Sequence, residues 1–247
     1  MNYGICNLSI VPVRILDSDK SEMINQLIYG DIIEILEEKN KWSKIRSIYD
    51  NYIGWIDVKQ YIKINNETKL ILNKPIYSLD LVEFIENENK ELFTIPIGSD
   101  VSNIDLLNHS FEGKTISGKS DKNSIISIAL SYLHSPYIWG GKTPFGIDCS
   151  GFTQMVYKIN GYKLFRDAKE QANQGETLSF IEESEPGDLA FFNNDAGEIV
   201  HVGIILEENY IIHASGKVRI DRIDHSGIYN NELNTHTHSL RFIKKII

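Results

Sequence analysis

The stretch Gly146-Ile147-Asp148-Cys149-Ser150-Gly151-Phe152 places a cysteine where a helix is expected to begin. Apolar residues recur at helical spacing after it, so the sequence predicts a helix from about Cys149 to Asn160, with Asp148 as its N-cap and Gly161 as its stop. A cysteine in the first turn of a helix lies beside unpaired backbone N–H groups and the positive end of the helix dipole. Both favour the thiolate, which is the nucleophilic form of the side chain.

A thiolate nucleophile needs a base, and two of the seven histidines stand out. His201 and His213 lie in strand-like runs on either side of Glu207-Glu208-Asn209, which is typical of a hairpin turn. With the turn centred on Glu207, the two histidines oppose each other directly on one face of the sheet. One imidazole would then take the thiol proton while the other fixes its tautomer, although a plain surface histidine remains an alternative.

A zinc site built from the cysteine and the two histidines is a competing interpretation. No closely spaced pair of ligands, such as CxxC or HxxxH, supports it, so we expect no metal and no cofactor. We expect His236-Thr237-His238 to lie in a solvated loop and Cys6 to be part of a core.

The sequence around Cys149 predicts helices, and the sequence after it predicts strands. A first helix is predicted over Asn123–His134, capped by Asn123 or Ser124, and a loop rich in glycine follows over Ser135–Ile147. Strands are predicted over Leu189–Phe192, Val200–Leu206, Tyr210–His213, Val218–Ile220 and Leu240–Ile246. Two helices followed by a run of strands predict an α+β domain with an antiparallel sheet.

The N-terminal half is expected to be all β. Short apolar runs rich in Ile, Val and Tyr cover Leu8–Val13, Asn25–Tyr29, Asp31–Leu36, Trp42–Ile48 and Tyr52–Val58. Their regular spacing predicts a small barrel or sandwich. A weaker set follows a junction at Asn65-Asn66-Glu67 and covers Lys69–Ile76, Glu91–Ile97 and Phe111–Ile116.

Composition narrows the possible partners. Lysine and arginine number 25 and aspartate and glutamate 34, which gives a net charge of −9 and argues against nucleic acid or an anionic membrane as partner.

No apolar run approaches the length of a membrane span, and no secretory signal is visible. A cytoplasmic location is therefore expected. The alternative is a trimmed signal with a periplasmic or secreted location. Two cysteines rule out a disulfide framework.

Several short motifs occur in one order across residues 122–247. They are Tyr137-Ile138-Trp139-Gly140-Gly141, Asp148-Cys149-Ser150-Gly151-Phe152, Pro186-Gly187-Asp188-Leu189, His201-Val202-Gly203-Ile204 and His213-Ala214. Together they resemble the NlpC/P60 cysteine peptidases. The resemblance implies a papain-like α+β core with Cys149 as nucleophile, His201 as base, His213 as orienting residue and Tyr137 as a stabiliser of the oxyanion.

Residues 1–63 resemble a bacterial SH3-like (SH3b) module. The motifs that carry this likeness are Val11-Pro12-Val13-Arg14, Tyr29-Gly30-Asp31, Trp42-Ser43-Lys44-Ile45 and Gly54-Trp55-Ile56. Residues 64–120 are assigned to a second SH3b-like domain and linker mainly from their size, and residues 121–247 to the catalytic domain. The expected architecture is therefore a papain-like NlpC/P60 domain preceded by small all-β SH3-like barrels.

This domain order resembles the γ-D-glutamyl-L-diamino acid endopeptidases (dipeptidyl-peptidase VI). The resemblance implies that the substrate is a murein peptide with a free N-terminal L-Ala, cut to release L-Ala-γ-D-Glu. It also implies that the first SH3b module walls off the cleft. Residues matching substrate-binding positions are Asp148, Ser150, Glu22, Tyr52 and Arg166.

Other interpretations remain open from the residues alone. In the alternative interpretation of the binding residues, Asp148 serves only as a helix cap, and Glu22 and Tyr52 are ordinary surface residues. The rival functions are a cell-wall amidase or acyltransferase with the same Cys-His pair, and a murein-binding SH3b protein. The preferred diamino acid and the oligomeric state are not determined by the sequence.

Overall fold

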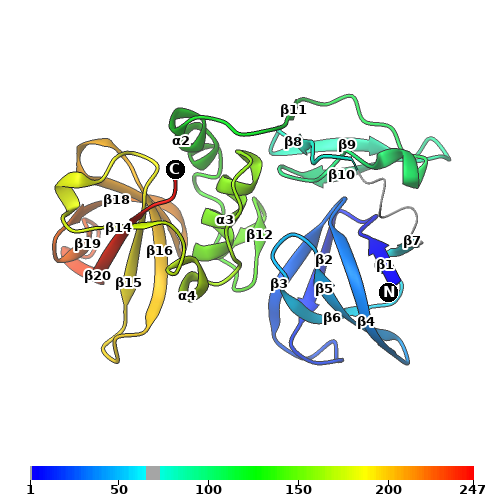
Figure 1. Ribbon diagram of the computed structural model, residues 1–247, viewed down its shortest axis with the longest axis horizontal. Helices are drawn as coiled ribbons and strands as arrows, with labels where there is room; N and C mark the ends of the chain where they lie inside the picture. Colours follow the sequence, from blue (N-terminus) through cyan, green and yellow to red (C-terminus); the bar gives the residue numbers. More distant parts are fainter. Residues whose placement is uncertain (1, 65–72) are drawn as a thin grey trace. The chain divides into compact units, whose positions relative to one another are not determined.

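The computed structural model describes residues 2–64 and 73–247, which divide into two compact units (Figure 1). The N-terminal unit comprises Met1–Gly118 together with Trp139–Pro144, and the C-terminal unit comprises Lys119–Ile138 and Phe145–Ile247. Most of the regular structure in the described residues is strand, with few helices.

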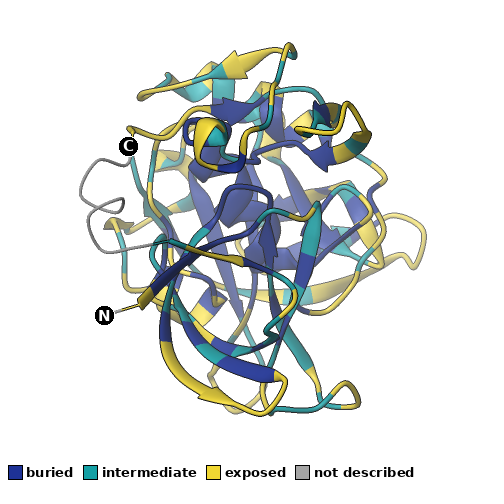
Figure 2. Ribbon diagram, turned by 90° about the vertical axis from the view of Figure 1, so that its right-hand side faces the viewer, coloured by how far each residue is buried: buried dark blue, intermediate teal, exposed yellow. Residues whose placement is uncertain are grey.

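The first part of the N-terminal unit is a seven-stranded antiparallel sheet. Its strands are β1 (Asn2–Ile5), β2 (Ile10–Arg14), β3 (Met23–Ile28), β4 (Ile32–Lys39), β5 (Trp42–Ser47), β6 (Ile53–Asp57) and β7 (Ile62–Ile64), in the order β3-β2-β6-β5-β4-β1-β7. The five predicted strands are confirmed as β2 to β6, whereas β1 and β7 are too short to show alternation. Val11, Val13, Leu27 and Ile45 belong to one buried core. Figure 2 colours the buried parts of the chain dark blue. Cys6 is fully buried in the same core, as expected.

Residues 73–118 add shorter elements to this unit: β8 (Tyr77–Ser78), β9 (Val82–Glu86), β10 (Leu92–Pro96), a 3-10 turn (Ile104–Leu107) and β11 (Thr115–Ile116). The strand predicted over Glu91–Ile97 is confirmed as β10, and the one over Phe111–Ile116 shrinks to β11. The prediction over Lys69–Ile76 was wrong for residues 73–76, which form no strand, while residues 69–72 and the junction at 65–67 lie outside the described residues. Ile85, Ile95 and Val101 share a buried cluster with Ile5 and Tyr29, so both parts of the unit have a common core.

Two main helices form one side of the C-terminal unit. They are α2 (Lys122–Ser131) and α3 (Cys149–Ile159), with the short α4 (Ala168–Gln171) after them. The predicted cap of α3 is confirmed, since Asp148 Oδ1 accepts from the Gly151 N–H at 2.6 Å. The predicted cap of α2 was wrong: Asp121 caps it by accepting from the Ser124 N–H at 2.9 Å. A short carboxylate directly before the helix satisfies the free N–H better than the residues inside it do.

The sheet of the C-terminal unit closes on itself. Its strands are β14 (Glu176–Leu178), β15 (Leu189–Asn193), β16 (Ile199–Ile205), β17 (Tyr210–Ser215), β18 (Lys217–Asp224), β19 (Gly227–Asn230) and β20 (Thr235–Lys245). Every neighbouring pair is antiparallel, and β20 pairs with both β15 and β19, which joins β15 to β20 in a ring. The expectation of a loop at His236-Thr237-His238 was wrong, because β20 begins at Thr235. Alternating Thr and His carry no apolar signal that would reveal this strand.

The motif Pro186-Gly187-Asp188 has a structural role in this unit. Asp188 is buried and accepts from Lys122 Nζ at 2.9 Å and from the Glu185 N–H at 2.8 Å. The Tyr157 hydroxyl donates to the Gly187 carbonyl. The turn therefore ties the start of β15 to both α2 and α3.

Among the described residues, no helix is long and apolar enough to cross a membrane.

Candidate active site

Cys149 is the first residue of α3, and this helix packs against β16 and β17. The residue is buried, with 6% of its surface exposed. The backbone N–H groups of Val202 and Ser150 lie close enough to the sulfur to lower the pKa of the thiol. Because Val202 directly follows His201 on β16, the sulfur lies next to the segment that carries the predicted base.

Burial, and then the charge of Asp148, raise the pKa of the Cys149 thiol to about 12. The two backbone N–H groups and Arg166 act in the opposite direction but do not outweigh them. The N–H groups at the start of the helix do favour the thiolate, as expected, but burial outweighs them. The resting side chain is a thiol, and it needs a base that removes the proton as the sulfur attacks.

His201 and His213 are in direct contact: His201 Nε2 and His213 Nδ1 lie 2.9 Å apart, and their rings are perpendicular. The predicted direct opposition was wrong, because Gly203 is the partner of His213 and the turn is centred on Glu208. Since the register differs from the prediction by an even number of residues, both histidines still share one face of the sheet. Gly203 makes this packing possible, because a Cβ there would lie 2.9 Å from the Cβ of His213.

Burial keeps both imidazoles neutral near neutral pH. The pKa of His201 lies well below 6.5 because of burial first, and then because of the charges of His213 and His238. Burial also lowers the pKa of His213, although its hydrogen bond to Asp221 acts in the opposite direction. A neutral imidazole has one ring nitrogen with a free lone pair, as a general base requires.

Two residues of the cluster were missed by the sequence analysis. His238 on β20 stacks on His201 with ring centroids 4.2 Å apart, and its pKa falls to about 4 mainly through burial. Asp221 on β18 accepts from His213 Nε2 at 3.0 Å. Neither lies in a recognisable motif, and only the closed sheet brings β16, β17, β18 and β20 together. The alternation of Arg219 and Asp221 with apolar residues is the one local signal for Asp221.

Tyr137 is held beside the nucleophile by backbone pairing. It forms a parallel bridge with Ile147, two residues before Cys149, and its N–H donates to the Gly216 carbonyl at 3.0 Å. Burial, and then the charges of Cys149 and Asp148, raise the pKa of its phenol to about 12. Tyr137 is thus a neutral O–H donor near the sulfur.

Asp148, Ser150 and Arg166 form a buried polar cluster under the start of α3. The Arg166 guanidinium donates to Asp148 Oδ1 at 2.9 Å and to Oδ2 at 2.6 Å. Its Nη1 also donates to the Ser150 hydroxyl oxygen at 3.0 Å. The Arg166 and Asp148 side chains are 1% and 6% exposed, so the pair is a desolvated bidentate ion pair beside Cys149.

Glu22 and Tyr52 belong to the N-terminal unit. Glu22 is exposed and accepts from Trp139 Nε1 at 2.7 Å, within that same unit. Gly140 follows Trp139 with φ at +77°, and a Cβ there would lie 2.6 Å from the Met23 carbonyl oxygen. Tyr52 is half-buried beside the turn at Asp50. The structure therefore gives Glu22 a partner from the Trp139-Gly140-Gly141 motif.

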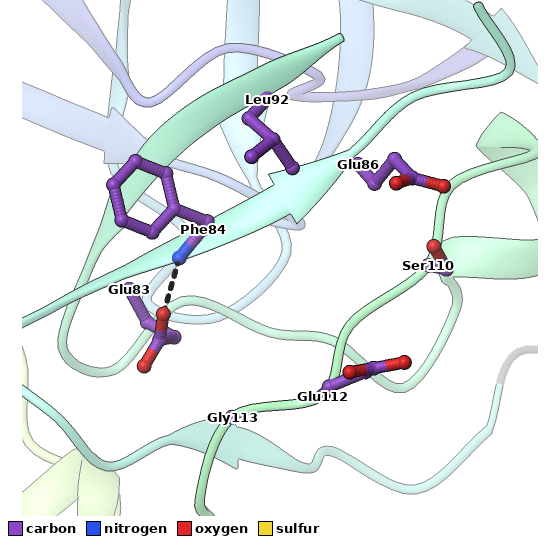
Figure 3. A pocket seen from close by; sticks show the side chains of 7 residues that line it. All are labelled: Glu83, Phe84, Glu86, Leu92, Ser110, Glu112 and Gly113. Carbon is purple, nitrogen blue, oxygen red and sulfur yellow. Dashed lines mark hydrogen bonds between the residues drawn. The ribbon is translucent and has the colours of Figure 1, made fainter. Parts of the chain in front are cut away.

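A surface pocket of the N-terminal unit carries no comparable chemistry. Figure 3 shows Glu83, Phe84, Glu86, Leu92, Ser110, Glu112 and Gly113 around it. Glu83 accepts from the Phe84 N–H, and Glu86 pairs with Lys90 at 2.6 Å. Within the described residues, no group of three or more His, Cys, Asp or Glu side chains is arranged to hold a metal ion.

We predict that replacing Arg166 by Met lowers the free energy of unfolding by about 3–5 kcal/mol, because the buried carboxylate of Asp148 would lose its cationic partner. Urea denaturation measures the loss. The double variant R166M/D148N should lose less than R166M, since it buries no charge. A loss below about 1 kcal/mol for R166M, the size expected of an exposed ion pair, would contradict the prediction.

Comparison with known families agrees with this geometry. Residues 134–237 match the NlpC/P60 family, and residues 16–60 match the bacterial dipeptidyl-peptidase SH3 domain. The chain aligns with the NlpC/P60 family protein from Bacillus cereus of known crystal structure with a TM-score of 0.83, over 99% of each chain and at 17% identity. That likeness shows the same fold.

Two relatives align over most of their length. Dipeptidyl-peptidase 6 of Lysinibacillus sphaericus is 26% identical over 87% of this chain and 90% of its own. Gamma-D-glutamyl-L-lysine dipeptidyl-peptidase of Bacillus subtilis is 28% identical over 76% of this chain and 71% of its own. The resemblance inferred from the motifs is thereby confirmed: the chain carries an NlpC/P60 domain in residues 134–237 and a bacterial dipeptidyl-peptidase SH3 domain in residues 16–60.

Proposed function

We propose that the protein is a cysteine peptidase that hydrolyses the γ-D-glutamyl-L-diamino acid bond of murein-derived peptides and releases L-Ala-γ-D-Glu. The observation that carries the proposal is the hydrogen-bonded His201–His213 pair on the strands packed against the α3 helix that begins with Cys149. The relatives named dipeptidyl-peptidase 6 and gamma-D-glutamyl-L-lysine dipeptidyl-peptidase support the bond and the substrate class.

In the proposed reaction, Cys149 Sγ attacks the γ-carbonyl carbon of D-Glu while its proton passes to His201. The tetrahedral intermediate collapses when His201 gives this proton to the leaving amine, which leaves a thioester. Water then attacks the thioester carbonyl while His201 takes its proton. The C–S bond breaks, His201 returns the proton to the sulfur of Cys149, and the dipeptide leaves with a free carboxyl group. Each step moves one proton through His201, so its low pKa is suited to a base that returns to the neutral form.

Two groups support the developing oxyanion in this scheme. The first is the Tyr137 phenol, and two observations support this role: the charge of Cys149 acts on its pKa, and its backbone pairs with Ile147. Backbone N–H groups at the start of α3 are the second source of donors. We further propose that α3 and the antiparallel sheet form a papain-like α+β core.

We also propose that the Asp148 carboxylate binds the free N-terminal amine of L-Ala. Its carboxylate is already bound by Arg166 and the Gly151 N–H, so an ammonium would be one further partner of a compensated group. Ser150 and Arg166 belong to the same cluster. The assignment of Glu22 and Tyr52 to substrate binding stays a prediction from the sequence.

Replacing Cys149 by Ala should abolish hydrolysis of L-Ala-γ-D-Glu-L-Lys while leaving the fold intact, because the thiol that forms the thioester is lost. Mass spectrometry of the products and circular dichroism check the two parts. Cys6→Ala is the matched control and should cut at the wild-type rate, since Cys6 lies in the core of the N-terminal unit. Turnover by C149A, or a product that shows cleavage next to the sugar, would refute the assignment.

Acetylation of the substrate's N terminus should strongly reduce kcat/KM. Acetylation removes the positive charge of the amine and places an acyl group where the Asp148 carboxylate would accept, so the blocked peptide loses a charge-assisted hydrogen bond. Steady-state kinetics on the free and N-acetyl tripeptides measure the ratio. Equal rates would remove the proposed role from Asp148, Glu22 and Tyr52.

The acid limb of the kcat/KM profile should lie below pH 6.5. A base with a lowered pKa stays unprotonated until the pH falls through that lowered value, so activity is retained at pH 6.5 and is lost only at more acidic pH. Rates from about pH 4 to about pH 8 would show this. A midpoint at or above 6.5 would mean that burial does not lower the pKa of His201 in solution.

A further inference from the structure

Asp221 is buried next to the catalytic histidines but takes no part in the reaction described above. It lies on β18, with 3% of its surface exposed. Its Oδ2 accepts from His213 Nε2 at 3.0 Å and from Arg219 Nε at 2.6 Å, and its Oδ1 accepts from Arg219 Nη2 at 3.0 Å. Residues 213 and 221 share a face of the sheet, because Arg219 pairs with His213 and Asp221 pairs with Ile211.

The protonation state of Asp221 follows from these partners. Burial by itself would raise the pKa of this carboxyl, but the hydrogen bonds from His213 and Arg219 lower it overall. An ionised carboxylate only accepts hydrogen bonds. His213 must therefore carry a proton on Nε2.

This one constraint sets the direction of the next hydrogen bond. A neutral His213 with its proton on Nε2 has its lone pair on Nδ1, and that atom lies 2.9 Å from His201 Nε2. His201 must then donate from Nε2. Its lone pair is left on Nδ1, the ring nitrogen that is not used by His213 and is free to take the thiol proton.

Without the carboxylate, the histidine pair would be ambiguous. The same contact forms equally well if His213 donates from Nδ1 and His201 accepts at Nε2. That arrangement places the proton of His201 on Nδ1, where it blocks acceptance of the thiol proton. A group beyond His213 that only accepts hydrogen bonds selects one of the two directions.

We propose that Asp221 is a positioning residue that, through His213, keeps the proton of His201 on Nε2 and so presents Nδ1 to Cys149. The proposal deepens the proposed function and rests on it. Arg219 holds the carboxylate with two hydrogen bonds, and His238 stacks on His201, so the carboxylate and the plane of the base are both fixed.

The direct test is the tautomer of each histidine in the wild-type protein. Long-range ¹H–¹⁵N spectra of protein labelled at histidine distinguish protonated from unprotonated ring nitrogens, and the variants H201Q and H213Q assign the signals. We expect both His201 and His213 to carry the proton on Nε2. A proton on Nδ1 of His201 would overturn the proposal, whatever any variant of Asp221 does.

The variant D221N tests the consequence. Its amide can donate to His213 Nε2 and thereby permit the reversed hydrogen bond, so the Nδ1-protonated form of His201 should appear in the spectrum. We expect kcat to fall about 10- to 100-fold with little change in KM, since general-base catalysis is worth roughly 10²- to 10⁴-fold and only part of it is lost. D221E should recover part of the rate, because it restores a carboxylate.

Glu232→Gln is the matched control. Glu232 is 71% exposed and pairs with Arg219 at 3.2 Å, so E232Q makes the same carboxylate-to-amide change in the same network without touching His213. It should leave the rate and both tautomers unchanged. Wild-type kcat and wild-type tautomers in folded D221N would overturn the proposal.

A second readout separates this proposal from the substrate assignment. Alkylation of Cys149 by iodoacetamide depends on removal of the thiol proton and needs no peptide. D221N should be alkylated about 10- to 100-fold more slowly than the wild type. If the wild type failed to cut the tripeptide, the proposed function would fail, yet the tautomers and the alkylation rates would still support or refute the role of Asp221.

Discussion

The ion pair between Asp148 and Arg166 is the constraint on which the C-terminal unit depends. Asp148 caps α3 through the Gly151 N–H and is bound on both oxygens by Arg166, with both side chains almost fully buried. A buried carboxylate is costly unless it is paired, so this geometry has little freedom. It fixes the first turn of α3, and with it the place of the thiol.

The histidines and Asp221 are brought together by the closed sheet, not by one continuous stretch of sequence. His201, His213 and Asp221 come from three adjacent strands, and His238 comes from the strand that closes the ring. Each side chain receives its orientation from the next, down to Arg219. Pre-organisation of this kind means that the base needs no rearrangement when the substrate arrives.

Burial has two effects at this site. It raises the pKa of Cys149 and lowers that of His201, so that the resting pair is a thiol and an imidazole rather than an ion pair. The same low-dielectric surroundings strengthen every hydrogen bond that holds the rings. As a consequence, the thiol must lose its proton as the sulfur attacks. In the proposal for Asp221, the direction of the His201–His213 hydrogen bond decides whether His201 Nδ1 can accept that proton.

Local signals in the sequence determined the elements and the identity of the main residues: the strands β2 to β6, the cap at Asp148, the helix that begins at Cys149, and the two histidines on one sheet face. These depend on side-chain periodicity and on capping chemistry within a few residues, which a sequence shows directly. Only the tertiary structure decided the register of His201 against His213, the approach of Asp221 and His238, and the thiol's raised pKa. Register, contacts between distant strands and desolvation arise from the packing of segments far apart in the chain, and no local pattern encodes them.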